Sequence, residues 1–351
     1  MRLLRPLVRQ RASALFDLVA GFVYSQTLQA CVQLELFEIL RDGPLSGVQL
    51  VDRVQLPAPA LLALLDAAAA TGLVQRVGDE FALGPQGAVL LANPSLLAMI
   101  RHHEHFYRDL SDPLAMLRGE VKAELAAYWP YAAGDVSSDA AQRYSDLMSQ
   151  SQIMVAEQVV AAYDFGLHRC LLDIGGGDGT FLSEVGEHFP ALDLKLFDLP
   201  PVAELARRKL AEDDSRIEAF GGSFADDPLP EGADLVSLIR IVHDHDDPTV
   251  MALFRRIFDY LPPGGRLLIA EPMAETTGAR AIAGAYFSLY FKAMGSGRPR
   301  SLKELRGFLE RVGFVLFEHH PTALPLMASV VTVQKPSPPP EIDGEGNVTK
   351  S

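Results

Sequence analysis

The segment that most constrains the fold of this chain is a glycine-rich loop between a predicted strand and a predicted helix. It reads Asp-Ile-Gly-Gly-Gly-Asp-Gly over residues 173–179, directly after the apolar residues 170–172. Glycines allow a tight turn and a close ligand approach, and free N–H groups at a helix start favour an anionic group. A dinucleotide fingerprint needs Gly-x-Gly-x-x-Gly, but counted from Gly175 its third glycine falls on Thr180. The loop therefore predicts a binding site for a nucleotide-type ligand. The position of Thr180 argues against a dinucleotide-binding site without excluding one.

From residue 170 onward, strand patterns and helix patterns alternate, which is typical of an α/β fold with a parallel sheet. The last two strand segments are close enough to form an antiparallel hairpin, so we expect seven strands with an antiparallel pair at the end. Strands are predicted at residues 170–174, 193–197, 217–221, 235–239, 266–270, 314–319 and 328–334. Helices are predicted at residues 180–188, 201–210, 248–260 and 301–312.

The first hundred residues have a different organisation, with helices followed by a small hairpin. Helices are predicted at residues 25–40, 46–54 and 59–71, and strands at 74–77 and 80–83 flank a Gly78-Asp79 turn. This order is that of a winged helix. The chain is therefore divided into four parts: a winged-helix domain (1–100), a helical connector (101–162), an α/β domain (163–335) and a disordered tail (336–351).

Charge and composition restrict the partners of the chain. The formal net charge is −14, which repels a phosphate backbone, and the predicted helix 59–71 contains no Lys or Arg, so nucleic acid is not expected. Two distant cysteines, Cys31 and Cys170, fit a reducing compartment. The sequence has no uncharged apolar stretch of about 18 residues, and its basic start lacks the apolar core of a signal peptide. A cytoplasmic protein without a membrane span is predicted.

Two strand ends carry candidate ligand-binding residues. Asp198 lies 25 residues after Asp173 (198 − 173), at the end of the second predicted strand. There a carboxylate can bridge two ribose hydroxyls, although capping of the next helix is an alternative role. Ser223 and Phe224 follow the third strand, and Phe224 is either an adenine-stacking ring or a core residue.

The fourth predicted strand delivers His-Asp-His-Asp-Asp, residues 243–247, to the carboxyl edge of the sheet, where ligands bind in open α/β folds. Adjacent residues on an extended turn rarely converge on one metal ion, so no metal is expected. A neutral imidazole is better suited to general-base chemistry. Glu271 ends the next strand and is expected either to hold the imidazole of His243 or to bind a loop.

These motifs resemble those of the plant-type small-molecule O-methyltransferase family, and the resemblance covers nearly the whole chain. The family pattern Asp-x-Gly-x-Gly-x-Gly corresponds to residues 173–179, and Leu-His-Asp-Trp-x-Asp corresponds to residues 242–247. The resemblance implies a class I methyltransferase Rossmann-like sheet, a winged-helix dimerisation domain, a homodimer and S-adenosylmethionine (SAM) as cofactor. It maps the catalytic base to His243 and one supporting carboxylate to Glu271. The implied cofactor-binding residues are Asp173, Gly175, Gly177, Asp198, Ser223 and Phe224.

The chain departs from the family at its second supporting carboxylate. The family segment Gly-Gly-Lys-Glu-Arg-Thr reads Ser-Gly-Arg-Pro-Arg-Ser at residues 296–301, so Pro299 replaces the glutamate. His245 replaces the family tryptophan, and whether His245 takes part in catalysis stays open.

Short segments near residues 107–110, 128–131, 144–148 and 293–300 resemble a subgroup from purple photosynthetic bacteria that methylates a tertiary hydroxyl of acyclic carotenoids. The resemblance implies a small hydrophobic hydroxylated substrate, and leaves open peripheral contact with the inner face of a photosynthetic membrane. An apolar substrate site is expected to include Phe106, Met148, Tyr286 and Tyr290, although an aromatic stripe is more often core. Three alternatives remain: a phenolic or polyketide acceptor, a SAM-binding hydroxylase of the same fold, and a DNA-binding regulator.

Overall fold

The computed structural model describes residues 5–128, 151–213, 215–277 and 282–338. The chain forms two compact units, Met1–Glu104 and His105–Ser351. Residues 129–150 of the predicted helical connector, and most of the predicted tail at 336–351, lie outside the described residues.

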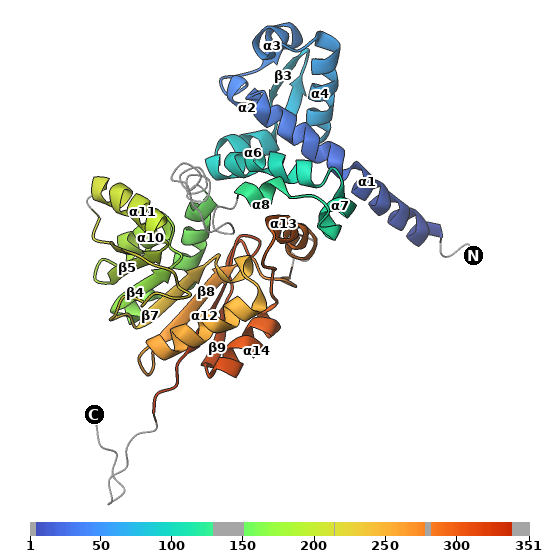
Figure 1. Ribbon diagram of the computed structural model, residues 1–351. Helices are drawn as coiled ribbons and strands as arrows, with labels where there is room; N and C mark the ends of the chain where they lie inside the picture. The colour runs from blue at the N-terminus through green and yellow to red at the C-terminus, as the bar shows by residue number, and fades with distance from the viewer. Residues whose placement is uncertain (1–4, 129–150, 214, 278–281, 339–351) are drawn as a thin grey trace, which may run out of the picture. The chain divides into compact units, whose positions relative to one another are not determined.

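The N-terminal unit combines helices with a small antiparallel sheet (Figure 1). The sheet order is β1-β3-β2, with Val74 paired to Leu83 and Leu45 paired to Phe81. The predicted hairpin is confirmed, whereas β1 was not predicted because two residues show no periodicity. Its elements are α1 (Arg5–Gln33), α2 (Leu36–Ile39), β1 (Leu45–Ser46), α3 (Gly47–Val54), α4 (Ala58–Ala70), β2 (Val74–Val77), β3 (Glu80–Leu83) and α5 (Pro85–Leu91).

Helix α1 is much longer than the predicted helix at 25–40, and it ends at Gln33, before α2 begins. Its C-terminal part contributes Cys31 and Val32 to the core of this unit. Its earlier part exposes large apolar side chains: Leu15, Phe16, Leu18, Val19 and Phe22 are 62–77% exposed. Residues Arg11–Gln33 are long and apolar enough to cross a membrane, by length and composition only. Soluble core helices meet the same criterion.

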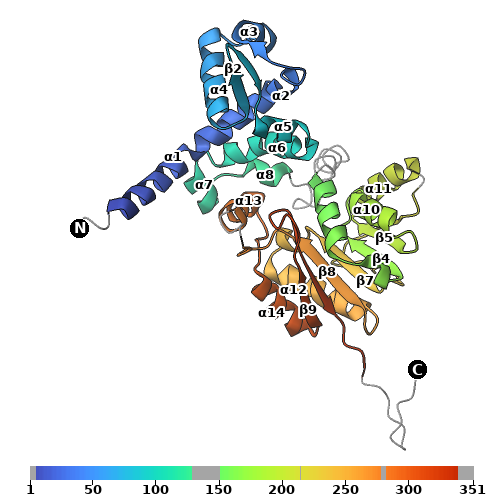
Figure 2. The same cartoon turned by 180° about the vertical axis from the view of Figure 1, so that it is seen from behind.

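The second unit begins within a helix at residues 94–109 and continues with further helices (Figure 2). Asp109 ends the first of these helices, and both of its carboxylate oxygens accept hydrogen bonds from the first backbone N–H groups of α8, from Glu124 at 2.6 Å and Leu125 at 3.0 Å. This side chain caps α8 and fixes the connector locally. The described elements here are α6 (Pro94–Asp109), α7 (Pro113–Arg118), α8 (Glu124–Tyr128) and a helix at 151–162.

The second unit is built on a seven-stranded sheet of order β6-β5-β4-β7-β8-β10-β9. All neighbours are parallel except at β10, which is antiparallel to both β8 and β9. The predicted class I methyltransferase sheet with a final antiparallel pair is therefore confirmed. Its strands are β4 (Cys170–Ile174), β5 (Asp193–Asp198), β6 (Glu218–Gly221), β7 (Leu235–Ile239), β8 (Arg266–Glu271), β9 (Val315–His320) and β10 (Ser329–Gln334).

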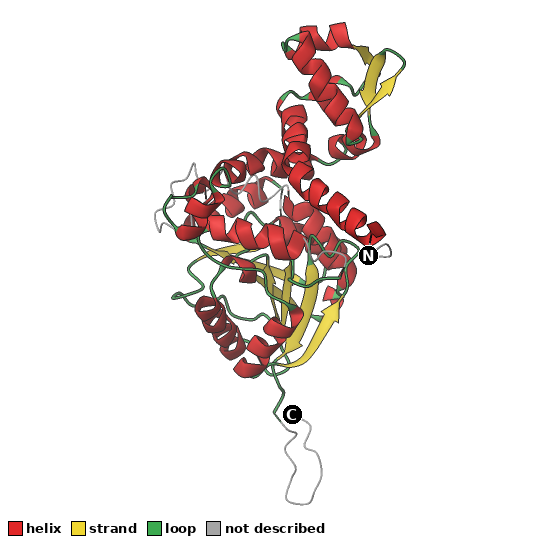
Figure 3. Cartoon of the chain, turned by 90° about the vertical axis from the view of Figure 1, so that its right-hand side faces the viewer, coloured by secondary structure: helices red, strands yellow, loops and turns green. Residues whose placement is uncertain are grey.

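Helices cover both faces of this sheet (Figure 3). One apolar core joins the sheet to α10, α11 and the helix at 151–162, and a second core joins it to α12 and α14. Strands β4 and β7 are buried throughout, as expected for central strands covered on both faces. The remaining elements are η3 (Phe165–Leu167), α10 (Thr180–His188), α11 (Pro200–Glu212), η4 (Val242–Asp244), α12 (Asp247–Tyr260), η5 (Ile282–Tyr286), α13 (Phe287–Met294) and α14 (Leu302–Val312).

Candidate active site

The glycine loop leaves the carboxyl end of β4 and turns into α10, as the sequence predicts. Gly175 adopts φ 73°, and a Cβ atom there would lie 2.3 Å from the Cδ1 atom of Ile241. Only glycine fits this turn. The loop is tied to the neighbouring strand end, because Gly175 N donates to Phe197 O at 2.8 Å and Gly177 N donates to Asp198 Oδ2 at 2.9 Å.

Two carboxyl groups lie beside this loop in a desolvated setting. Asp173 is 1% exposed, and burial raises its pKa to about 8, although a 2.6 Å hydrogen bond from Ser237 Oγ opposes the shift. Within the described part of the chain, its Oδ2 atom has no hydrogen-bond partner. Burial raises the pKa of Asp198 to about 6, against hydrogen bonds from the backbone of Gly177 and Leu199. A buried carboxyl oxygen of this kind suits a cationic ligand group.

The loop after β6 carries Ser223 and Phe224, as predicted. Ser223 N donates to Asp227 Oδ2 at 2.8 Å, so this serine is held by its own loop. The ring of Phe224 packs edge-to-face against His245, with 5.2 Å between the ring centroids. Phe224 therefore links the β6 end to the histidine-containing turn after β7.

That turn, η4, holds His243 at the carboxyl edge of the sheet, and Glu271 ends the adjacent strand β8. Glu271 Oε2 accepts a hydrogen bond from His243 N at 2.9 Å, whereas His243 Nδ1 is 3.9 Å from the same oxygen. The carboxyl group thus binds the turn backbone and lies close to the imidazole without a hydrogen bond to it. Burial raises the pKa of Glu271 to about 7.

The imidazole of His243 is buried and held in its neutral form. Burial lowers its pKa well below the usual value, and the charges of Arg240 and Arg300 lower it further. A second carboxyl group near the ring comes from Asp244, whose Oδ1 is 3.4 Å from His243 Nε2. Burial raises the pKa of Asp244 well above its usual value. The turn therefore places a carboxyl group of its own beside the imidazole, whereas Pro299 carries no carboxyl group.

An aromatic cluster adjoins His243. The ring of Phe291, on α13, lies 4.8 Å from the imidazole. Phe106, on α6, packs against Tyr286 and Tyr290 with centroid distances of 5.9 and 5.5 Å. Three of the four predicted substrate residues are thus in one cluster, while Met148 lies outside the described residues. Helix α13 lies over the edge of the sheet (Figure 1).

Sequence reasoning missed Ser237 and Arg300. Ser237 holds Asp173, and Arg300, which is 0% exposed, binds the backbone of the histidine turn. Each of these contacts joins segments about 60 residues apart in the chain. A pattern of neighbouring residues in the sequence cannot predict contacts between residues so far apart in the chain.

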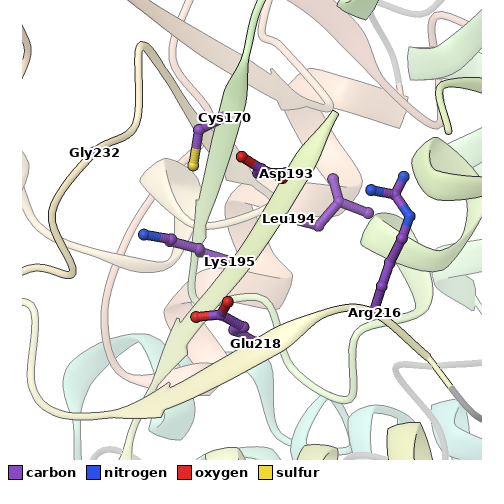
Figure 4. Close-up of a pocket in the computed structure, with 7 residues that line it drawn as sticks. All are labelled: Cys170, Asp193, Leu194, Lys195, Arg216, Glu218 and Gly232. Carbon is purple, nitrogen blue, oxygen red and sulfur yellow. The ribbon is translucent and has the colours of Figure 1, made fainter. Parts of the chain in front are cut away.

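A separate cavity of about 350 Å³ lies at the opposite edge of the sheet, beside Cys170 and the starts of β5 and β6 (Figure 4). Its cationic side chains are already bound to backbone carbonyls: Lys195 Nζ to Glu231 O at 2.6 Å and Arg216 Nη2 to Phe189 O at 2.9 Å. These contacts hold the loops at this edge together. The candidate active site is therefore at the carboxyl edge of the sheet and not at this cavity.

The sheet order and the loop with its two carboxyl groups define a class I methyltransferase. An O-methyltransferase domain model matches residues 107–315, and an O-methyltransferase dimerisation domain model matches residues 16–93. The chain belongs to this O-methyltransferase family of enzymes.

Curated relatives include a demethylspheroidene O-methyltransferase from Cereibacter sphaeroides, 42% identical over 96% of this chain and 90% of the relative. A protein of the same name from Rhodobacter capsulatus is 40% identical over 95% of this chain and 84% of the relative. Among solved structures, the mitomycin 7-O-methyltransferase MmcR is 27% identical with a TM-score of 0.77, covering 93% of this chain and 99% of that one.

Proposed function

We propose that the protein transfers a methyl group from SAM to the tertiary hydroxyl of an acyclic carotenoid of the demethylspheroidene type, with His243 as general base. The observation that carries the chemistry is the position of His243, buried and neutral at the same sheet edge as Asp173 and Asp198. The acceptor is inferred from the two relatives that are 40–42% identical over 95–96% of the chain.

The residues present fit SAM. The Oδ2 atom of Asp173, which has no hydrogen-bond partner among the described residues, suits its ammonium group, and the Asp198 carboxylate suits its ribose hydroxyls. Gly175 and Gly177, in the loop that leads to α10, carry no side chains, so the methionine part of SAM can approach the loop backbone closely, while Ser223 and Phe224 border the adenine side. When bound, SAM supplies a methyl group activated on a sulfonium.

The role of His243 is to take the hydroxyl proton as the oxygen attacks the methyl carbon. A tertiary alcohol is far less acidic than a phenol, so proton removal accompanies transfer and no alkoxide forms beforehand. General-base assistance of this type contributes about 10²–10⁴-fold to a rate. Glu271 holds the turn, and alignment of the acceptor supplies much of the remaining acceleration.

The aromatic cluster around Phe106, Tyr286, Tyr290 and Phe291 would hold the apolar chain of the acceptor. Burial raises the pKa of Tyr286, so this phenol stays neutral in the cluster. Apolar walls with few polar groups are typical of sites for hydrophobic ligands.

A panel of acceptors tests this function: demethylspheroidene, a carotenoid lacking the hydroxyl, and simple phenols, each incubated with SAM carrying a labelled methyl group. We expect label only in the hydroxylated carotenoid. Transfer to phenols instead would favour the phenolic alternative, and a hydroxylated product without label would favour the hydroxylase alternative.

The protein is further proposed to act as a homodimer through its N-terminal unit. The exposed apolar residues Leu15, Leu18, Val19 and Phe22 recur at helical spacing on α1 and form a stripe that a second copy can cover. A cytoplasmic enzyme is proposed to meet its poorly water-soluble acceptor at the inner surface of a membrane, and vesicle flotation with and without carotenoid tests that contact.

A further inference from the structure

One segment, residues 296–300, binds four consecutive carbonyl groups of the turn that carries His243. The donors are two side-chain nitrogens of Arg300, one backbone N–H and one serine hydroxyl. The contacts are Arg300 Nη1 to Val242 O (2.6 Å), Arg298 N to His243 O (2.8 Å), Ser296 Oγ to Asp244 O (2.8 Å) and Arg300 Nη2 to His245 O (2.7 Å). Residues 296–300 therefore hold the backbone on both sides of His243.

Arg300 makes the largest share of these contacts and is fully buried. Besides its two carbonyl bonds, its Nε and Nη2 atoms donate to Asp247 Oδ1 at 3.0 and 2.7 Å. Asp247 is the first residue of α12, so one guanidinium joins the turn to the helix that follows it. A lysine ammonium has the charge but lacks the planar arrangement of donors that these contacts use.

The segment also approaches the turn closely. Gly297 has φ 80°, and a Cβ atom there would lie 2.1 Å from His243 O. The two backbones are therefore in direct contact, and a shift of residues 296–300 would shift His243.

Charged and titratable groups face His243 from several elements: Arg240 after β7, Glu271 on β8, Asp244 and His245 in its own turn, and Arg300. Both arginine charges act against protonation of the imidazole. Arg300 thus combines a geometric contact with an electrostatic effect on the same ring.

We propose that Arg300 is a positioning residue for methyl transfer, which fixes residues 242–247 and thereby aims the His243 imidazole at the acceptor hydroxyl. The proposal rests on the proposed function, in which His243 is the base. Although Pro299 leaves this segment without the family glutamate, the segment still contacts the histidine turn, through bonds to the backbone carbonyl groups of residues 242–245.

The test compares Arg300→Lys, Arg300→Gln and the control Arg306→Gln, whose arginine lies on α14 over the ring of Phe317. For each we measure kcat and the KM values of both substrates across the acid limb of the pH–rate profile. Arg300→Lys is expected to lower kcat by about 10²-fold with little change in KM, because misalignment affects the reacting geometry. The acid limb of the pH–rate profile of Arg300→Lys is expected at the wild-type pH, because lysine keeps the positive charge.

Arg300→Gln is expected to lower kcat by as much as Arg300→Lys does. It should also move the acid limb to higher pH, since one of the cations that lower the pKa of His243 is gone. The control keeps the wild-type rate and profile. Wild-type kcat in Arg300→Lys, or a loss of SAM affinity that equals the loss of kcat, would overturn the proposal. Arg300→Lys decides the question if Arg300→Gln does not fold. A fully active His243→Ala variant would instead refute the proposed base, whatever Arg300 does.

Discussion

At the scale of single residues, the candidate active site contains polar side chains that are already buried in the protein without a ligand. Asp173 accepts one hydrogen bond, from Ser237, and leaves its second oxygen unpaired within the described structure. Leaving such an atom buried costs about 1–3 kcal/mol. A cationic ligand group at this position would offset that cost.

This arrangement predicts that SAM binding releases protons. Because burial raises the pKa of Asp173 to about 8, the free enzyme holds that proton at neutral pH. An ammonium group beside it lowers the pKa, so about one proton leaves per SAM bound near neutral pH. Titration calorimetry in buffers of different ionisation enthalpy measures the release, and Asp173→Asn should abolish it. A binding enthalpy independent of the buffer would contradict the assignment.

The positions of Asp173, Asp198 and His243 at the carboxyl edge of the sheet could be predicted from the sequence, because each lies at or just after the end of a strand whose apolar pattern is clear. The contact made by Glu271 could not be predicted, because its hydrogen bond goes to the backbone N–H of His243 and a sequence shows no backbone geometry. Ser237 lies inside a buried strand, where a serine has no local signal of function.

At the scale of elements, the turn η4 depends on a neighbour that is distant in the chain. The contact between Gly297 and His243 leaves no room for a side chain. Backbone in the left-handed region is also strained for residues other than glycine.

Gly297→Ala is therefore expected to destabilise the protein by about 1–3 kcal/mol and to lower methylation more than SAM affinity. Thermal unfolding, SAM titration and initial rates give the three quantities. Gly284→Ala is a suitable control, since a Cβ atom there meets nothing within 4 Å. Unchanged rates in Gly297→Ala would show that the segment does not support the turn.

The strands of the sheet were predicted nearly to the residue, because buried parallel strands form short apolar runs between clear turns. Helix α1 was predicted too short, beginning at residue 25 instead of Arg5. In its early part the stripe of large apolar side chains is exposed, whereas only its C-terminal part packs into the core of its own unit. That feature points to a partner outside the chain.

At the scale of the whole molecule, the exposed face of α1 predicts self-association. Replacing both Leu18 and Phe22 by Asp places charges where apolar contact is expected, so the double variant should be monomeric. Light scattering after size-exclusion chromatography reports the mass. Leu316→Asp changes a comparably exposed leucine on β9 and should leave the dimer intact. A wild-type monomer would contradict the proposed homodimer.

The measurement that tests the central claim most directly uses demethylspheroidene and SAM with an isotopically labelled methyl group. Wild-type protein and His243→Ala are compared after both are shown to bind SAM equally. Mass spectrometry of the product should locate the label as a methyl ether on the tertiary oxygen with wild type, at a rate reduced by about 10²–10⁴-fold in His243→Ala. Absence of the labelled ether with wild type, or equal rates for the two proteins, would contradict the account.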